Sequence, residues 1–194
     1  KKVKKKDIIM IDNGLIALEV LNVQPYHVTC RVLNKGRLEK RKSINIPGIR
    51  INLPSITKKD MDDVKLGAKY HVDYVAQSFV RHPDDIRKMR KLLASLSSNA
   101  MIIAKIEDEE GVINMDQIID EADGVMVARG DLGVQIPFEE IPIVQKEMVG
   151  KCIGKGKPVI IATHLLESMV ENPRPTRAEV TDVANAVFEK ADCI

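Results

Sequence analysis

The spacing of apolar residues changes along the chain and divides it into two parts. Short apolar runs separated by turn residues fill residues 1–47, and such runs predict β-strands. The Asp-Asn-Gly sequence at 12–14 lies between two of these runs, and it predicts a β-hairpin because Asn and Gly tolerate positive φ. A second hairpin is expected around the Asn-Lys-Gly sequence at 34–36. We therefore predict an all-β domain over residues 1–47.

Residues 48–194 form the second predicted domain, in which apolar strands alternate with amphipathic helices. Proline and glycine are frequent at 47–54, which is typical of a hinge between two domains. Apolar runs predict strands at 72–79, 101–107, 124–128 and 158–163. Apolar residues at helical spacing predict helices at 57–70, 82–96, 112–119, 141–152 and 176–190.

The last predicted helix has a clear start and a clear apolar face. Thr176 and Glu179 have the spacing of a capping box, in which an N-cap hydroxyl and an acid three positions later bond to each other's backbone. The helix at 57–70 begins in a similar way. The valines of the last helix are expected to face the core; they are Val180, Val183 and Val187.

Apolar strands between amphipathic helices predict a parallel sheet covered on its outer face, hence an α/β fold. A doubly wound sheet and a (β/α)8 barrel both fit this pattern. A complete barrel needs about 250 residues, so four strands would be half of one. Residues 191–194 (Ala-Asp-Cys-Ile) resemble the start of a fifth strand, which favours a partial (β/α)8 TIM barrel.

Composition adds few constraints. The chain has 194 residues, a net charge of +2 and 44% hydrophobic residues, which is typical of a globular protein. Five lysines lie within residues 1–6, but no aromatic residues accompany them, so we expect no nucleic-acid partner. The three cysteines are widely spaced, which favours free thiols and a cytoplasmic location. No apolar stretch reaches the roughly 18 residues of a membrane span, so no membrane partner is expected.

Polar residues follow each predicted parallel strand, where the functional residues of such folds collect. Ser78 follows the first strand, and Lys105 and Glu107 come at the end of the second. Asp131 follows the third strand after Arg129 and Gly130, and Thr163 ends the fourth. Because the carboxyl ends of parallel strands lie at the same edge of a sheet, we expect these side chains to line one site at that edge.

This set of groups predicts a magnesium site. Two carboxylates with open positions suit Mg²⁺, which keeps several waters and takes substrate oxygens. Lys105 beside the ion suits a reaction that develops oxyanion or phosphoryl charge. The backbone of Gly130 and Asp131, where it opens a short helix, offers N–H groups to a carboxylate or phosphate.

Each residue also has an ordinary structural explanation. Glu107 is one of several interchangeable acids at 107–110, Lys105 can pair with either carboxylate, and Thr163 can be a plain strand-end hydroxyl. The four histidines show no metal-ligand spacing, and no Ser-His-Asp or Cys-His arrangement is visible. The pattern alone therefore leaves the reaction unnamed.

The chain resembles the pyruvate kinase family at these residues. Two segments of the first domain, 11–16 and 43–48, resemble the family's mobile β-barrel cap, which is inserted in its barrel. The resemblance covers essentially the whole chain and follows the family's order. The segments that resemble its signature blocks are 102–112, 123–137, 157–169 and 172–187.

The resemblance implies transfer of the phosphoryl group of phosphoenolpyruvate to ADP, giving pyruvate and ATP. Glu107 and Asp131 match the ligands of Mg²⁺ or Mn²⁺, and Lys105 matches the lysine that stabilises charge on the phosphoryl group and the enolate. Gly130 and Asp131 match the backbone that receives the substrate carboxylate. Thr163 matches the hydroxyl implicated in protonating the enolate.

Further predictions rest on the same resemblance. Lys42 matches a cap lysine that contacts the nucleotide, and Ser78 matches a residue of the substrate pocket. The resemblance also implies dependence on K⁺, whose ligands lie outside this chain, and a homo-oligomer, a tetramer in the family. Asn13, Ser43 and His164 depart from the common pattern and are expected to tune the chemistry.

The resemblance further implies a partial enzyme, since the family's earlier barrel strands and its final strand are not in this chain. We expect open sheet edges to make the chain associate or dissolve poorly and its activity to be weak or absent. Two other functions remain open at this point. One is a magnesium-dependent lyase acting on pyruvate-type enolates, and the other is a non-catalytic chain that retains the fold.

Overall fold

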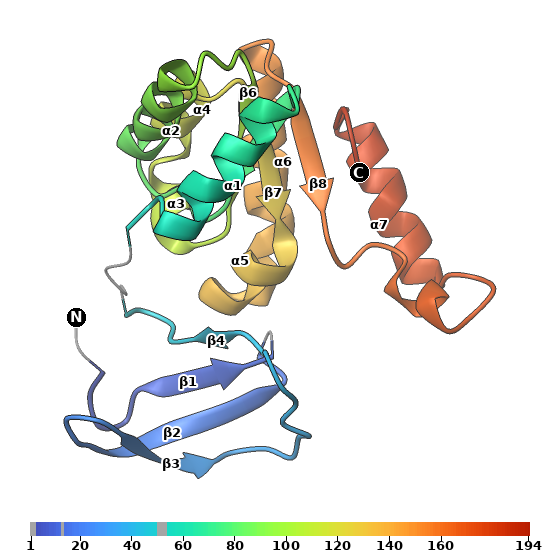
Figure 1. The fold of residues 1–194 in the computed structure, drawn as a ribbon. Coiled ribbons are helices and arrows are strands. Elements are labelled where there is room, and N and C mark those ends of the chain that lie inside the picture. The colour runs from blue at the N-terminus through green and yellow to red at the C-terminus, as the bar shows by residue number, and fades with distance from the viewer. Residues whose placement is uncertain (1–2, 13, 50–53) are drawn as a thin grey trace.

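The computed structural model describes residues 3–12, 14–49 and 54–194. Two sheets organise these residues, a small antiparallel one near the N-terminus and a parallel one covered by helices (Figure 1). Within the described residues, no helix is long and apolar enough to cross a membrane.

The antiparallel sheet has the strand order β3-β2-β1-β4, and its first hairpin confirms the prediction. Ile11 pairs with Ile16 across the turn, where Asp12 and Gly14 have φ of 55° and 85°. Asn13, one of the departures from the family pattern, lies outside the described residues. The strands are β1 (Ile8–Ile11), β2 (Ile16–Val23), β3 (Val28–Val32) and β4 (Ile44–Asn45).

The second predicted hairpin is wrong, because β4 pairs with β1 and not with β3. The side chain of Asn34 explains the difference. It accepts a hydrogen bond from the Ala17 N–H and donates one to the Leu15 carbonyl, both at 2.7 Å. These bonds attach the chain after β3 to the start of β2, so the turn at 34–36 does not reverse the chain onto β3.

The parallel sheet has the order β5-β6-β7-β8. This order follows the chain without the reversal that marks a doubly wound sheet. Cys193 forms a parallel bridge with Ile160, so the end of the chain lies beside β8 as the start of a further strand would. The strands are β5 (Tyr74–Gln77), β6 (Met101–Ile106), β7 (Gly124–Ala128) and β8 (Val159–Ala162).

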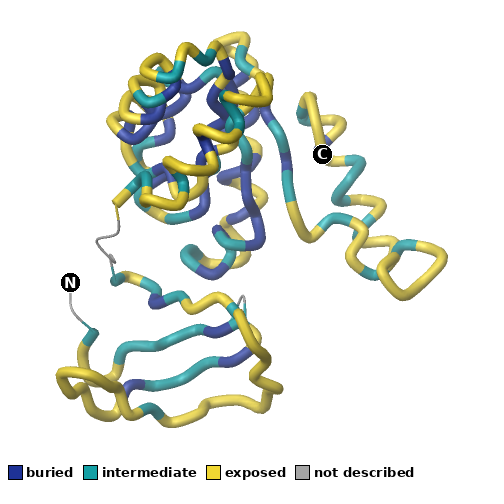
Figure 2. Tube along the Cα trace, viewed as in Figure 1, coloured by how far each residue is buried: buried dark blue, intermediate teal, exposed yellow. Residues whose placement is uncertain are grey.

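Helices α2, α4 and α6 form a layer on the parallel sheet, with α2 against α4 and α4 against α6. The buried residues gather in this layer and in the sheet, whereas the antiparallel sheet and α7 are largely half-buried or exposed (Figure 2). The α-helices are α1 (Lys58–Lys69), α2 (Pro83–Ser95), α3 (Glu109–Ile113), α4 (Met115–Glu121), α5 (Arg129–Gln135), α6 (Ile141–Gly154) and α7 (Arg177–Phe188).

The helix predicted at 112–119 is divided into α3 and α4 at Asn114. The Asn114 side chain donates a 2.8 Å hydrogen bond to the Arg81 carbonyl, across to the loop after β5. The capping boxes of α1 and α7 are present as predicted, and Thr57 and Thr176 are the N-cap residues.

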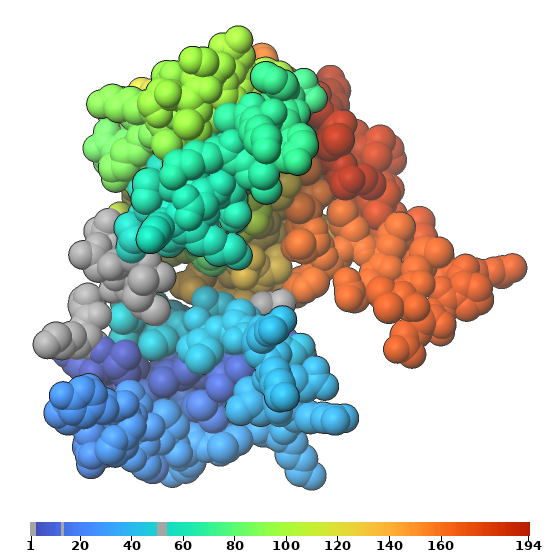
Figure 3. Space-filling view, in the orientation of Figure 1, coloured from blue at the N-terminus to red at the C-terminus, as the bar shows by residue number. Residues whose placement is uncertain are grey.

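Helix α7 presents a different face to the protein from the one predicted. Val180 and Val187 are 53% and 61% exposed, so these two predicted inward valines point largely to solvent, whereas Val183 is half-buried. The residues that face inward are Asp182, Ala186 and Glu189, which lie on one face of the helix. Polar partners on α5 and α6 bond to the two acids. The segment between β8 and α7, orange in Figure 3, projects from the body.

Candidate active site

Three predicted residues meet at the ends of β5 and β6. Ser78 directly follows β5, and Lys105 lies near the end of the neighbouring β6. The Lys105 Nζ donates to Ser78 Oγ at 3.0 Å and lies 2.6 Å from Glu107 Oε1. Adjacent parallel strands end at the same edge, which is why residues 27 positions apart make this contact. The structure therefore joins Ser78, Lys105 and Glu107 in one group.

Glu107 is the most deeply buried charged group of the site, with a side chain 1% exposed. Its Oε2 accepts a 2.6 Å hydrogen bond from the Phe79 N–H, and Phe79 holds a left-handed backbone with φ of 52°. Burial raises the pKa of Glu107, and the bonds from Lys105 and Phe79 oppose that rise. The charge of Asp131 also raises the pKa of Glu107, as the smallest of these influences.

Gly130 and Thr163 form a second group at the ends of β7 and β8. The Gly130 N–H donates to Thr163 Oγ1 at 2.8 Å, while Thr163 has a φ of 69°. A Cβ on Gly130 would lie 3.0 Å from that oxygen and 3.5 Å from the His164 ring, so close packing requires glycine here. The predicted short helix does begin at this point, as α5. The Gly130 N–H, however, already has a partner within the chain.

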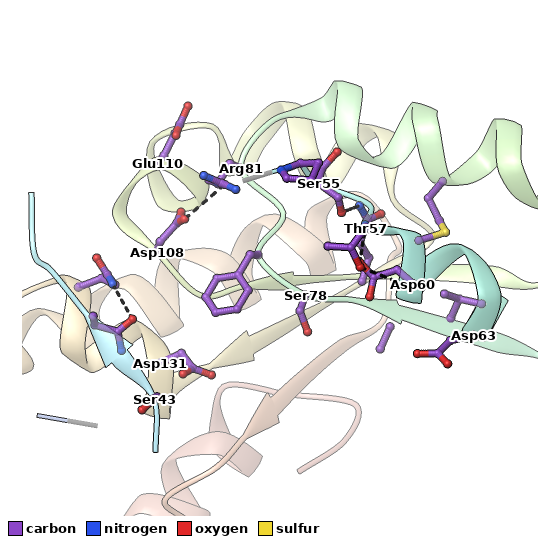
Figure 4. Close-up of a pocket in the computed structure, with 18 of the residues that line it drawn as sticks. Ser43, Ser55, Thr57, Asp60, Asp63, Ser78, Arg81, Asp108, Glu110 and Asp131 are labelled. Atoms are coloured by element: carbon purple, nitrogen blue, oxygen red, sulfur yellow. Dashed lines mark hydrogen bonds and ion pairs between the residues drawn. The ribbon is translucent and has the colours of Figure 1, made fainter. Parts of the chain in front are cut away.

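A cleft of about 970 Å³ is lined by α1, β5 and the loop after it, by α5 and by the chain at and after β4. Ser78 and Asp131 line it, together with Ser43 and Asn45 at β4 (Figure 4). The amide of Gln135 on α5 donates to the Asn45 side chain at 3.3 Å across the cleft. Of the predicted site residues, the cleft wall thus presents Ser78 and Asp131.

Lys42 is not brought to the strand ends. Its Nζ lies 3.0 Å from Asp12 and 3.8 Å from Glu39, so it pairs with acids of the antiparallel part of the chain. The next residue, Ser43, does line the cleft. The nucleotide contact predicted for Lys42 therefore has no support from its position here.

Glu107 and Asp131 are the residues that could hold a divalent cation. Among the described residues there is no cluster of three or more His, Cys, Asp or Glu side chains of the kind that encloses a metal. Magnesium does not need one, since it is commonly held by one or two carboxylates, waters and substrate oxygens. The mutual repulsion of these two carboxylates is a charge imbalance that a divalent cation would relieve. The residues present fit Mg²⁺ or Mn²⁺.

Comparison with known proteins shows the family of the chain. The family model described as "Pyruvate kinase, barrel domain" matches residues 1–194. The chain belongs to the pyruvate kinase family. Pyruvate kinase of Bacillus licheniformis is 51% identical over 189 residues, which cover 96% of this chain and 32% of that protein. Pyruvate kinase of Dictyostelium discoideum is 48% identical over 194 residues, 99% of this chain and 38% of that protein. The chain thus spans about a third of the length of these relatives.

Two arginines near the site were not identified by sequence reasoning. Arg81 lines the cleft and lies 3.8 Å from Asp108 (Figure 4). It comes four residues after β5, so a wider window beyond each strand end would have included it. Arg129 was noted only as a strand-end residue, but it is buried and bonded to both Thr163 and α7. The residues next to Arg129 in the sequence do not indicate these partners.

Proposed function

We propose that this chain carries part of the active site that transfers the phosphoryl group of phosphoenolpyruvate to ADP, giving pyruvate and ATP. The observation that supports this most is the joining of Ser78, Lys105 and Glu107 at one strand edge, next to Asp131. An ammonium group beside two carboxylates suits a reaction in which phosphoryl charge must be positioned and neutralised. The names of the relatives point to the same reaction.

Lys105 is proposed as the group that stabilises developing charge. The P–O bond to the enolate oxygen breaks as an oxygen of ADP bonds to phosphorus, so negative charge appears on the enolate. A fixed ammonium that is only a quarter exposed, held by Ser78 and Glu107, stabilises such charge without rearranging. Ser78 and the backbone at Gly130 and Asp131 are proposed to position the substrate.

Thr163 is proposed to deliver the proton that converts the enolate to pyruvate. Its Oγ1 accepts the Gly130 N–H, so the hydroxyl proton remains available for donation. The left-handed backbone at Thr163 holds that hydroxyl against Gly130. Binding of the substrate carboxylate at the Gly130 N–H would compete with Thr163, which couples substrate binding to release of this hydroxyl.

Glu107 and Asp131 are proposed to hold Mg²⁺ or Mn²⁺. When bound, the metal acts as a Lewis acid and template for phosphoryl oxygens. Dependence on K⁺ is proposed from the family alone, with ligands outside this chain. Lys42 remains a proposed nucleotide contact from the family resemblance, although it pairs with Asp12 here.

The finer architecture is part of the same proposal. We propose that residues 48–194 are half of a (β/α)8 TIM barrel and residues 1–47 part of its inserted all-β barrel cap. The strand order without reversal and the bridge of Cys193 to β8 support the barrel. A homo-oligomer, a tetramer by family resemblance, and a cytoplasmic location are also proposed; the three free cysteines suit a reducing compartment.

A chimaera tests the proposed reaction, because it supplies the two thirds of the relatives that this chain does not match. The 189 matching residues of the Bacillus licheniformis enzyme are replaced by those of this chain, and ATP formation from phosphoenolpyruvate and ADP is measured. We expect activity that falls by roughly 10²–10³ in Lys105→Met, as for removal of one electrostatic stabiliser. Asp62→Asn, a change in an exposed ion pair, is the control. A folded chimaera without activity, or full activity in Lys105→Met, would refute the proposal.

A further inference from the structure

The guanidinium of Arg129 is buried and uses every one of its N–H groups. Its Nε and Nη2 donate to the Thr163 carbonyl at 3.2 and 3.0 Å, and Nη2 also donates to the His164 carbonyl at 3.1 Å. Its Nη1 donates to Gln145 Oε1 at 3.4 Å and to Asp182 Oδ1 at 2.7 Å. Five donors thus have five bonds, which is the full capacity of an arginine side chain.

Three of these bonds go to the carbonyls of two residues with a strained backbone. Thr163 and His164 have φ of 69° and 53°, in the left-handed region that residues other than glycine rarely adopt. Such a conformation persists only where surrounding contacts impose it. The guanidinium donates to the carbonyls of both residues and is therefore a contact that can maintain this conformation. The same conformation places Thr163 Oγ1 on the Gly130 N–H.

The other bonds connect this loop to two helices. Asp182 lies on α7 and forms an ion pair with Arg129, whose side chain is 9% exposed. Gln145 lies on α6, and its Nε2 donates to Glu189 at the end of α7 at 2.8 Å. Two polar residues on the inward face of α7, Asp182 and Glu189, therefore connect to Arg129 directly or through Gln145, beside the core contact of Ala186.

We propose that Arg129 is a positioning residue for the Thr163 hydroxyl, and that Asp182 makes the position of α7 a determinant of the active site. This inference rests on the proposed function for what the hydroxyl does, but the positioning itself is a separate claim. Arg129 touches neither the cleft nor the strand-end carboxylates among the contacts described, so it acts through Thr163 and His164. A shift of α7 would alter the Thr163 backbone through one ion pair.

Lysine cannot replace this arginine. A lysine has three N–H donors on a single nitrogen, whereas the site requires a planar fork with bonds in several directions. Lysine would keep the charge and its attraction to Asp182 but lose the simultaneous hold on the two carbonyls. Arg129→Lys therefore separates positioning from charge. Asp182→Asn keeps the shape of the α7 partner and removes only its charge.

The test is NMR on the isotope-labelled chain, as wild type and with Arg129→Lys or Asp182→Asn. Arg174→Lys, an exposed change in the same loop, is the control. We expect Arg129→Lys to speed hydrogen exchange at the Gly130 amide roughly tenfold, the effect of losing one hydrogen bond, and to remove the left-handed signature from the Thr163 shifts. Asp182→Asn should move the same resonances by a smaller amount. The control should leave them unchanged.

Titration with phosphoenolpyruvate in the presence of Mg²⁺ provides the second measurement. Because Arg129→Lys frees the Gly130 N–H from Thr163, its competitor for the substrate carboxylate, the proposal predicts a dissociation constant lowered by up to about tenfold in this variant and unchanged in Arg174→Lys. If a folded Arg129→Lys or Asp182→Asn variant had the same Thr163 and Gly130 chemical shifts as the wild type, the positioning claim would be overturned. Absence of any phosphoenolpyruvate response in the wild type would instead overturn the proposed function, while the Thr163 resonances still decide the role of Arg129.

Discussion

The ion pair of Lys105 and Glu107 makes a quantitative prediction about stability. Lys105→Met removes the ammonium that lies 2.6 Å from a carboxylate whose side chain is 1% exposed. Removing one partner of a buried pair costs about 3–5 kcal/mol, because the remaining charge stays buried. The Lys105 side chain is 24% exposed and Glu107 keeps its bond from Phe79, so the low end applies. We expect a loss of about 3 kcal/mol in the free energy of unfolding at neutral pH.

The pH dependence of this loss has a definite sign. Burial already raises the pKa of Glu107 above 4.5, and removing Lys105 takes away the largest opposing influence. A carboxyl whose pKa is raised in the folded state is stabilising when protonated, so its cost is present at high pH and disappears as pH falls toward 4.5. The loss caused by Lys105→Met should therefore shrink by at most about 1.4 kcal/mol per pH unit across that window.

The assay is equilibrium unfolding in urea between pH 5 and 8, with EDTA present so that no divalent cation contributes. The double variant Lys105→Met with Glu107→Gln should recover most of the loss, because a neutral amide needs no ammonium partner. Lys65→Met, which breaks the exposed pair with Asp62, should cost less than about 1 kcal/mol. Equal stability of Lys105→Met and wild type at pH 8, or a double variant no better than the single one, would refute the reasoning.

Three further predictions concern groups away from the strand ends. The Lys157 ammonium donates to three backbone carbonyls at the end of α4. Lys157→Met should therefore lower the free energy of unfolding by about 2–3 kcal/mol. A melting temperature equal to that of the wild type would contradict this. Burial raises the pKa of the Cys152 thiol to about 11, so mass mapping after alkylation of the folded chain should find label on the exposed Cys193 and none on Cys152. Bonds from Ser168 lower the pKa of Glu179 to about 2. The ionised Glu179 carboxylate should therefore stabilise the fold below pH 4.5, and this stabilisation should be lost as the pH falls toward 2. A carbon NMR titration of Glu179 with a midpoint near 4.5 would show that these bonds are absent.

Residues at the ends of parallel strands could be placed from the sequence because the fold rule is local. Once β5 and β6 are recognised as adjacent parallel strands, Ser78 and Lys105 must end at the same edge. The contact between them needed no knowledge of the remaining chain. The apolar strands and the capping boxes of α1 and α7 were predictable for the same reason, since each depends on neighbours within a few positions.

Contacts that depend on distant partners could not be predicted. Arg129 bonds to Asp182, 53 positions later, and Asp182 lies on the inward face of α7 where the valine spacing predicted none but apolar residues. The valine pattern of that helix was read correctly as periodic, yet it indicates the wrong face. Likewise, the Asn34 side chain accepts a hydrogen bond from the backbone at the start of β2, and β4 pairs with β1. The spacing of apolar residues in the sequence predicts neither the Arg129–Asp182 pair nor the bonds of Asn34.

The most direct test of the account is the binding of Mn²⁺ to the purified chain, followed by electron paramagnetic resonance with and without phosphoenolpyruvate. We expect the wild type to bind Mn²⁺, phosphoenolpyruvate to tighten the binding, and Asp131→Asn and Glu107→Gln each to abolish it. Asp62→Asn should bind as the wild type does. A folded wild type that binds no Mn²⁺, or variants that bind it as tightly as the wild type, would contradict the assignment of these two carboxylates.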